Sequence, residues 1–307
     1  MSKAQQQTFS LKKLPGLLKD TYTSWMAHEP FRASAVVAYY AVLSLPALLV
    51  IIINLVGAVW GQDIVQGKLT QEISTALGQD AAASIQGMIA ETQGSGKNTL
   101  STIIGLGVLL FAATGVFYHL KISLNTVWRI APDPKAPIKK IVVDRVLSFA
   151  FILAIGFLLL ISFMVTAAIS ILSDFIRDAL PNILLYLAYG LDFLLSIGII
   201  SVLFGLMFKY LPDAKIKWRS VRIGAVLTAV LFVVGKSALG FYFGQAEPGS
   251  TYGAAGTIVL VLLWVSYSCL ILFFGAEFTY SYAETFGHGV EPNKKAVVNE
   301  QAKIKGQ

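Results

Sequence analysis

The sequence predicts an all-helical protein that crosses a membrane six times. Of its 307 residues, 56% are hydrophobic and only 13% are charged, whereas soluble domains carry about 25% charged residues. A helix needs about 20 mostly apolar residues to span a bilayer. Six stretches reach that length: residues 33–60, 99–120, 146–172, 183–208, 221–244 and 253–282. None alternates with period two as the strands of an outer-membrane barrel do, so we expect helices.

Residues 1–32 are expected to form a cytoplasmic tail that contains an amphipathic helix. Between Leu14 and Met26, apolar residues recur at helical spacing opposite Lys19 and Asp20. This pattern is typical of a helix that lies on a membrane surface. It fits equally a helix that packs against the cytoplasmic ends of the spans, and both interpretations can hold together.

The first span carries polar residues beside a proline. Tyr40 and Ser44 are four positions apart and therefore share one face of a helix. Pro46 removes a backbone hydrogen bond and is expected to kink the helix. Because a bilayer offers no water to the freed carbonyl group, we expect polar groups to gather near this kink.

The segments between and after the spans are expected to differ in structure. Residues 61–98 have an apolar residue every three to five positions, which predicts two short amphipathic helices that break near Gly78. We expect these helices to lie across the outer end of the helix bundle. Loops of this length usually have a role, so a lid or a partner surface is suspected. Residues 33–283 then form the transmembrane domain, and residues 284–307 a disordered cytoplasmic tail.

The positions of the basic residues predict the orientation of the chain. Of the 24 lysines and arginines, only Lys68, Lys97, Arg177 and Lys236 fall outside the segments expected on one side of the membrane. Cytoplasmic segments are enriched in these residues, so both termini are expected in the cytoplasm. Orientation explains most of the net charge of +7, and nucleic acid is therefore not an expected partner.

Two charged residues fall deep inside the expected spans. Asp192 lies about ten residues from the outer end of its span and Lys236 about eight, which places them ~15 Å and ~12 Å deep. One interpretation is a polar cavity open to the outer side and formed with Tyr40, Ser44 and Ser196, which binds an anionic head group or couples a proton. The other is an ion pair that fixes helix register, or a lysine that extends to the outer head groups.

Glu277 lies near the inner end of the last span and suggests a second polar site. In one interpretation, Glu277 lies at the membrane interface and bonds to a basic residue on the cytoplasmic side, for which Arg32 and Arg129 are the candidates. The other is a cytoplasmic gate in which such a bond breaks during a transport cycle. Asn125 completes this candidate gate or interface.

Enzyme chemistry finds little support in the sequence. His28, His119 and His288 lie in separate regions, and Cys269 is the one cysteine. The sequence contains no HExxH motif and no Walker-type motif, so neither a zinc site nor a nucleotide-binding loop is predicted. We expect no catalytic site, no metal and no cofactor.

Three sequence motifs occur in a recognisable order along the chain. They are the stretch from Arg32 to Pro46, the group Asn125, Trp128 and Arg129, and the stretch from Tyr252 to Gly256 followed by Trp264 and Gly275-Ala-Glu277. Their order, spacing and six-span layout resemble the YihY/BrkB family of bacterial inner-membrane proteins, once mislabelled as ribonuclease BN. The resemblance covers roughly Trp25 to Tyr282. It implies a plasma-membrane protein for which transport is the usual interpretation, and it supplies no substrate.

Transport is the function that the sequence favours, because charges lie in the membrane where a scaffold has no need of them. We expect a transporter or translocase of a small solute or an envelope lipid that is not driven by ATP on its own chain. Its expected partners are membrane lipids, with an anionic lipid or small solute as the ligand, and an oligomer is possible. The alternative is a lipid-binding or scaffold protein of the cell envelope that transports nothing.

Overall fold

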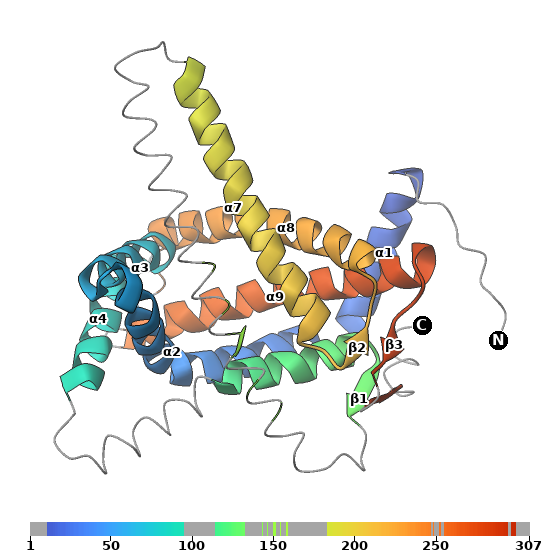
Figure 1. Ribbon diagram of the computed structural model, residues 1–307, viewed down its shortest axis with the longest axis horizontal. Coiled ribbons are helices and arrows are strands. Elements are labelled where there is room, and N and C mark those ends of the chain that lie inside the picture. The colour runs from blue at the N-terminus through green and yellow to red at the C-terminus, as the bar shows by residue number, and fades with distance from the viewer. Residues whose placement is uncertain are drawn as a thin grey trace.

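The computed structural model describes residues 11–94, 114–132, 183–246, 255–293 and 296–298, with a few isolated positions between them. This part of the chain is mostly helical, as predicted (Figure 1). After a 3₁₀ turn, Leu11–Lys13, come α1 (Leu14–Ala27), α2 (Pro30–Trp60), α3 (Gln62–Leu77), α4 (Gln79–Gly94), an unlabelled helix over 114–127, α7 (Ile183–Tyr210), α8 (Trp218–Ala246) and α9 (Gly256–Phe286).

Two of the described helices, α8 and α9, are long and apolar enough to cross a membrane. A third span is added if the two segments of α2, Pro30–Leu45 and Leu48–Asn54, count as one. They meet at a 52° bend, which lies where Pro46 was expected to kink the helix. The structure therefore supports two or three spans and does not confirm six. The expected spans at 99–120 and 146–172 lie largely outside the described residues.

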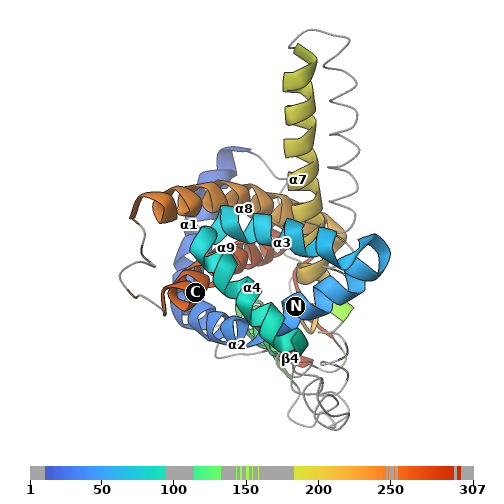
Figure 2. The ribbon, with the colours of Figure 1, turned by 90° about the vertical axis from the view of Figure 1, so that its left-hand side faces the viewer.

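Helix α9 is the central helix of the described bundle. It packs against α1, α2 and α8, and Figure 1 shows α2, α9 and α8 side by side. Its inner face buries Leu272, Phe273 and Ala276 in the main apolar core. By contrast, α7 crosses α8 and its N-terminal half projects away from the other labelled helices in both views (Figures 1 and 2).

Helices α8 and α9 meet through two reciprocal contacts between a glycine and a threonine. A Cβ atom built on Gly224 would lie 1.8 Å from Thr279 Oγ1, and one on Gly275 would lie 1.8 Å from Thr228 Oγ1. Each threonine hydroxyl donates at 2.7 Å to the carbonyl oxygen of the glycine four residues before it. Small residues that allow backbones to approach closely are typical of contacts between membrane helices.

Residues 61–94 form two helices that break at Gly78, as the sequence predicted. Gly78 has a φ of +92°, a backbone conformation that glycine adopts without strain. Val65 and Ile85 pack with Ile53 of α2 and with Phe243 and Leu260 of α8 and α9. The hairpin thus covers one end of the bundle, and Figure 2 shows α3 and α4 lying across it.

The segment after α9 is ordered, whereas we expected residues 284–307 to be a disordered tail. Strand β3 (Glu291–Pro292) pairs antiparallel with β2 (Ala214–Lys215), and β4 (Ala296–Val298) pairs antiparallel with β1 (Ile130–Pro132). These hydrogen-bonded pairs hold the segment after α9 against the loops that follow the 114–127 helix and α7. The prediction is therefore wrong for residues 284–293 and 296–298.

Helix α1 has the bounds that the apolar pattern predicted and packs on the bundle. Leu17 is buried against Phe278 and Tyr282 of α9. Its opposite side leaves Tyr22 and Met26 exposed. Packing of α1 on the bundle is therefore confirmed, whereas its cytoplasmic location stays a prediction. The membrane-surface interpretation also stays a prediction, which these exposed apolar side chains suit.

Candidate functional site

Glu277 is completely buried and forms an ion pair with Arg129. Its side chain has 0% exposure, and Arg129 Nη2 lies 2.6 Å from Glu277 Oε1. Of the two arginines that the sequence offered, Arg129 is thus the partner. Arg32 instead binds Glu29 at 2.7 Å, with 80% of its side chain exposed. A buried carboxylate is costly unless it is paired, so the contact offsets much of the cost of burying Glu277.

The end of the 114–127 helix places Arg129 against α9. Arg129 has a φ of +55°, and its backbone N–H donates to Thr126 O at 3.0 Å, which turns the chain at the helix end. The preceding Trp128 is buried and donates from Nε1 to Ala276 O at 3.0 Å. Trp128 and Arg129 therefore contact two consecutive residues of α9, Ala276 and Glu277, and fix one register.

The guanidinium group of Arg129 makes further contacts besides the ion pair. It donates to Ser24 Oγ and to Val127 O, both at 2.6 Å. Its central carbon lies 3.7 Å from the centre of the Tyr280 ring. The planar guanidinium group, with several N–H donors in fixed positions, can make all these contacts at once, whereas the single ammonium group of a lysine cannot.

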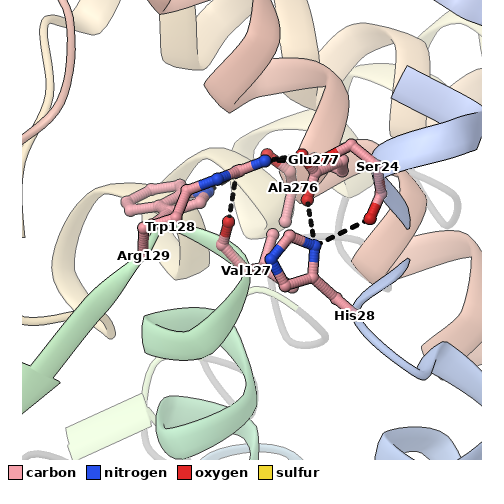
Figure 3. A network of polar contacts seen from close by, with 7 residues as sticks. All are labelled: Ser24, His28, Val127, Trp128, Arg129, Ala276 and Glu277. Carbon is pink, nitrogen blue, oxygen red and sulfur yellow. Dashed lines mark hydrogen bonds and ion pairs between the residues drawn. The ribbon is translucent and has the colours of Figure 1, made fainter. Parts of the chain in front are cut away.

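His28, in the turn between α1 and α2, touches the other oxygen of Glu277 (Figure 3). Its Nδ1 lies 2.7 Å from Ser24 O and 3.5 Å from Glu277 Oε2. Because a carbonyl oxygen only accepts, Nδ1 carries the proton of that hydrogen bond. The histidine side chain is 3% exposed. Glu277 Oε2 has no hydrogen-bond partner among the described residues.

Three segments far apart in the sequence thus meet at one carboxylate. Ser24 and His28 come from α1 and its end, Arg129 from the end of the 114–127 helix, and Glu277 from α9. Ser24 and His28 were not predicted as site residues. Their four-residue spacing on α1 is the signal that could have found them, because it places both on one side of that helix.

Asn125 belongs to a second buried polar cluster. Asp213 N–H donates to Asn125 Oδ1 at 2.8 Å, and Asn125 Nδ2 donates to Asp213 Oδ2 at 3.2 Å. Lys121 Nζ lies 3.0 Å from Asp213 Oδ1. The cluster ties the 114–127 helix to the turn after α7. Lys121 and Asn125 are four residues apart, so they lie on one face of this helix.

Tyr40 and Ser44 both lie on α2, and Tyr40 contacts the 114–127 helix. The Tyr40 ring stacks on the ring of His119 with centroids 3.8 Å apart. Ser44 is fully buried, and its hydroxyl donates to Ala41 O at 3.2 Å. These described contacts do not join either residue to Lys236, so the outer polar cavity that includes all three stays a prediction.

Lys236 has a partner that the sequence did not suggest. Its Nζ lies 3.4 Å from Glu72 Oε2 of α3, and both side chains are partly exposed. The amphipathic hairpin thus supplies the opposite charge. Ser196 lies exposed on α7. The side chain of Asp192, on the same helix, lies outside the described part of the structure, and its pairing with Lys236 stays a prediction.

Apolar membrane-length helices packed around a buried ion pair define an integral helical membrane protein. The family model described as Virulence factor BrkB matches residues 21–300. The chain therefore belongs to the BrkB family, as the motifs around Arg32, Arg129 and Glu277 indicated.

Curated relatives are membrane proteins of the same group, named UPF0761 membrane proteins. One from Methylibium petroleiphilum is 29% identical over 215 residues, which cover 69% of this chain and 49% of the relative. One from Rhodospirillum centenum is 26% identical over 287 residues, covering 89% of this chain and 60% of the relative. The chain spans about half the length of the first of these. No solved structure matches.

Proposed function

We propose that this protein is a transporter or translocase that moves a small solute or an envelope lipid across the bacterial inner membrane. In this proposal the Arg129–Glu277 ion pair forms a gate. The pair lies at the end of the bundle that carries α1 and the short strands, opposite the α3–α4 hairpin (Figure 1). The distribution of basic residues predicts that this end faces the cytoplasm.

The observation that carries the proposal is a buried carboxylate held by segments that are far apart in the sequence. A buried ion pair contributes little to stability compared with apolar residues of similar size. Here its two charges come from separate segments, and Glu277 Oε2 has only a 3.5 Å contact with His28 Nδ1. A contact of this kind suits a two-state element, in which one arrangement of bonds is exchanged for another.

Opening such a gate requires replacement partners for both charges. Leaving one charge of a buried pair without its partner costs about 3 to 5 kcal/mol. Water or a polar substrate that enters between α9 and the 114–127 helix would supply the missing hydrogen bonds. Binding of substrate would then favour the open state by its differential affinity.

The energy for net transport has to come from outside this chain's own sequence. No Walker-type phosphate-binding motif occurs in it. An ion gradient or an energised partner protein would supply that energy. A carrier that works down a concentration gradient, or a lipid scramblase, needs neither of these energy sources.

The proposal is tested with the full chain reconstituted into liposomes. One assay follows head-group-labelled lipids between leaflets, and a second follows release of trapped small solutes. We expect wild-type protein to accelerate one of these processes. Glu277→Gln should reduce the rate at least about tenfold, because each transport cycle requires the gate to close again and this variant favours the open state. Asp20→Asn, on the exposed side of α1, serves as the matched control.

Two results would contradict the proposal. One is a wild-type protein that moves neither lipids nor solutes faster than empty liposomes. The other is a folded Glu277→Gln variant with the full wild-type rate. Circular dichroism and size-exclusion chromatography of each variant distinguish a loss of transport from a loss of folding.

A second candidate function is lipid binding without transport. A cavity beside His28, at the junction of α1 and α2, favours it. This function predicts that lipid binds the purified protein while both liposome assays stay at the level of empty liposomes.

A further inference from the structure

A cavity of about 230 Å³ lies between the end of α1, the start of α2 and the 114–127 helix. Its walls include Trp25, His28, Glu29, Arg32, Ile122 and Phe273. His28 also contacts the site of the Arg129–Glu277 pair, because its Nδ1 lies beside Ser24 O and Glu277 Oε2 (Figure 3). The Nε2 atom is on the opposite side of the ring.

Two residues of the cavity wall each carry one buried polar atom that has no hydrogen-bond partner among the described residues. These atoms are Trp25 Nε1 and His28 Nε2. The indole N–H can only donate. With the proton of a neutral ring on Nδ1, His28 Nε2 can only accept. Because unpaired buried groups are costly, an occupant that offers both an acceptor and a donor fits this wall.

The cavity also carries one charge of each sign. Glu29 Oε2 lies 2.7 Å from Arg32 Nε, and both side chains are largely exposed to an incoming molecule. Glu29 has a φ of +52°, an uncommon backbone conformation for a residue other than glycine. Such conformations concentrate at functional sites. An occupant with one negative and one positive group would match this carboxylate and guanidinium together.

The size and surroundings of the cavity indicate a head group at a membrane surface. Its volume far exceeds the ~30 Å³ of one water molecule and is below the about 300 to 1,000 Å³ of pockets for drug-sized ligands. Val36 and Ile122 of the cavity wall are exposed apolar side chains. The nearby rings of Tyr22 and Phe31 are exposed beside Trp25. Aromatic residues of this kind gather at the membrane–water interface.

We propose that this cavity binds a phosphodiester head group that carries a primary ammonium. Its phosphate oxygens accept from Trp25 Nε1 and pair with Arg32, while its ammonium donates to His28 Nε2 and pairs with Glu29. A membrane lipid and a free soluble diester present the same chemistry, and the exposed apolar side chains favour the lipid. This inference goes beyond the proposed function, because the cavity binds whether or not the gate opens.

The test is calorimetric titration of the purified full chain in detergent. The probes are a short-chain phosphatidylethanolamine, a short-chain phosphatidylglycerol and soluble glycerophosphoethanolamine. We expect the ethanolamine lipid to bind at least about tenfold more tightly than the glycerol lipid, because only the ammonium pairs with Glu29. Similar affinity for the soluble diester would identify a free head group as the ligand, whereas much weaker binding of the diester would identify the lipid.

Variants test the named contacts. Trp25→Phe keeps an aromatic ring and removes the N–H, and we expect it to weaken binding of the ethanolamine lipid about tenfold or more. Arg32→Gln should act in the same direction, and because the Arg32 side chain is exposed, we expect this variant to fold as wild type. Trp218→Phe, an exposed tryptophan at the start of α8, is the control and should bind as wild type.

Two results would overturn the inference. One is equal affinity for the two lipids, and the other is wild-type affinity in both Trp25→Phe and Arg32→Gln. Neither result would affect the gate, because the liposome assay depends on Glu277 and uses no variant of the cavity. Conversely, a failure of the transport assays would leave this binding result intact.

Discussion

At the scale of single residues, Arg129 and Glu277 depend on each other for their burial. The guanidinium group is held by Glu277, Ser24 and Val127 and rests on the Tyr280 ring. Sequence reasoning reached two candidate partners for Glu277. The choice of Arg129 depends on a left-handed turn at the end of a helix and on a contact between residues 148 positions apart in the sequence. Neither can be predicted from the local sequence.

Removing one charge of this pair should destabilise the protein more than removing both. We expect Glu277→Met or Arg129→Met alone to lower the free energy of unfolding by about 3 to 5 kcal/mol, because the remaining charge is buried without its partner. The double variant should recover most of that loss. A double-mutant cycle from denaturant unfolding in detergent measures the coupling. Additive losses would show that the two charges act independently.

A second residue-level prediction concerns Asp213. Asp213→Asn removes the charge that faces Lys121, and we expect a loss of about 1.5 to 3 kcal/mol, the usual value for a hydrogen bond to a charged group. Thermal unfolding of the variant beside Asp20→Asn measures it. Equal unfolding temperatures for these two variants would mean that the Asp213 cluster is not a structural tie.

At the scale of elements, α8 and α9 approach each other closely at two glycine–threonine contacts. Gly224→Ala should lower the free energy of unfolding by about 1 to 3 kcal/mol, because its Cβ would overlap Thr279 Oγ1. Adding Thr279→Ala should restore part of the lost free energy of unfolding, because it removes the overlapping atoms. Denaturant unfolding compares both with Gly67→Ala, whose Cβ meets open space. A stable Gly224→Ala variant would contradict this packing.

Sequence periodicity predicted some elements well and others not at all. The bounds of α1, the break at Gly78 and the apolar helices α8 and α9 follow from patterns of many residues. Strands β1 to β4 have two or three residues each and pair with segments far away in the chain. So short a strand carries no detectable period, and its partner is fixed by the bundle that brings the loops together.

At the scale of the whole molecule, composition predicted a helical membrane protein, and the family confirms the membrane class. Counting apolar stretches predicted six spans; the described residues support two or three, and the expected spans at 99–120 and 146–172 lie largely outside them. Hydropathy measures each stretch alone and carries no information on how helices pack. For the same reason, depth along two spans suggested that Lys236 pairs with Asp192, while its described partner, Glu72, comes from the hairpin that covers the bundle end.

The central claim is that the Arg129–Glu277 pair closes a gate between α1, the 114–127 helix and α9. Thr21, fully buried on the α9 side of α1, reports on that closure when replaced by cysteine in a Cys269→Ala background. The measurement is the rate at which a water-soluble maleimide modifies Thr21→Cys in liposomes. We predict slow modification with Glu277 present and at least about tenfold faster modification with Glu277→Gln, because the open state gains population. Equal rates in the two proteins would contradict the gate.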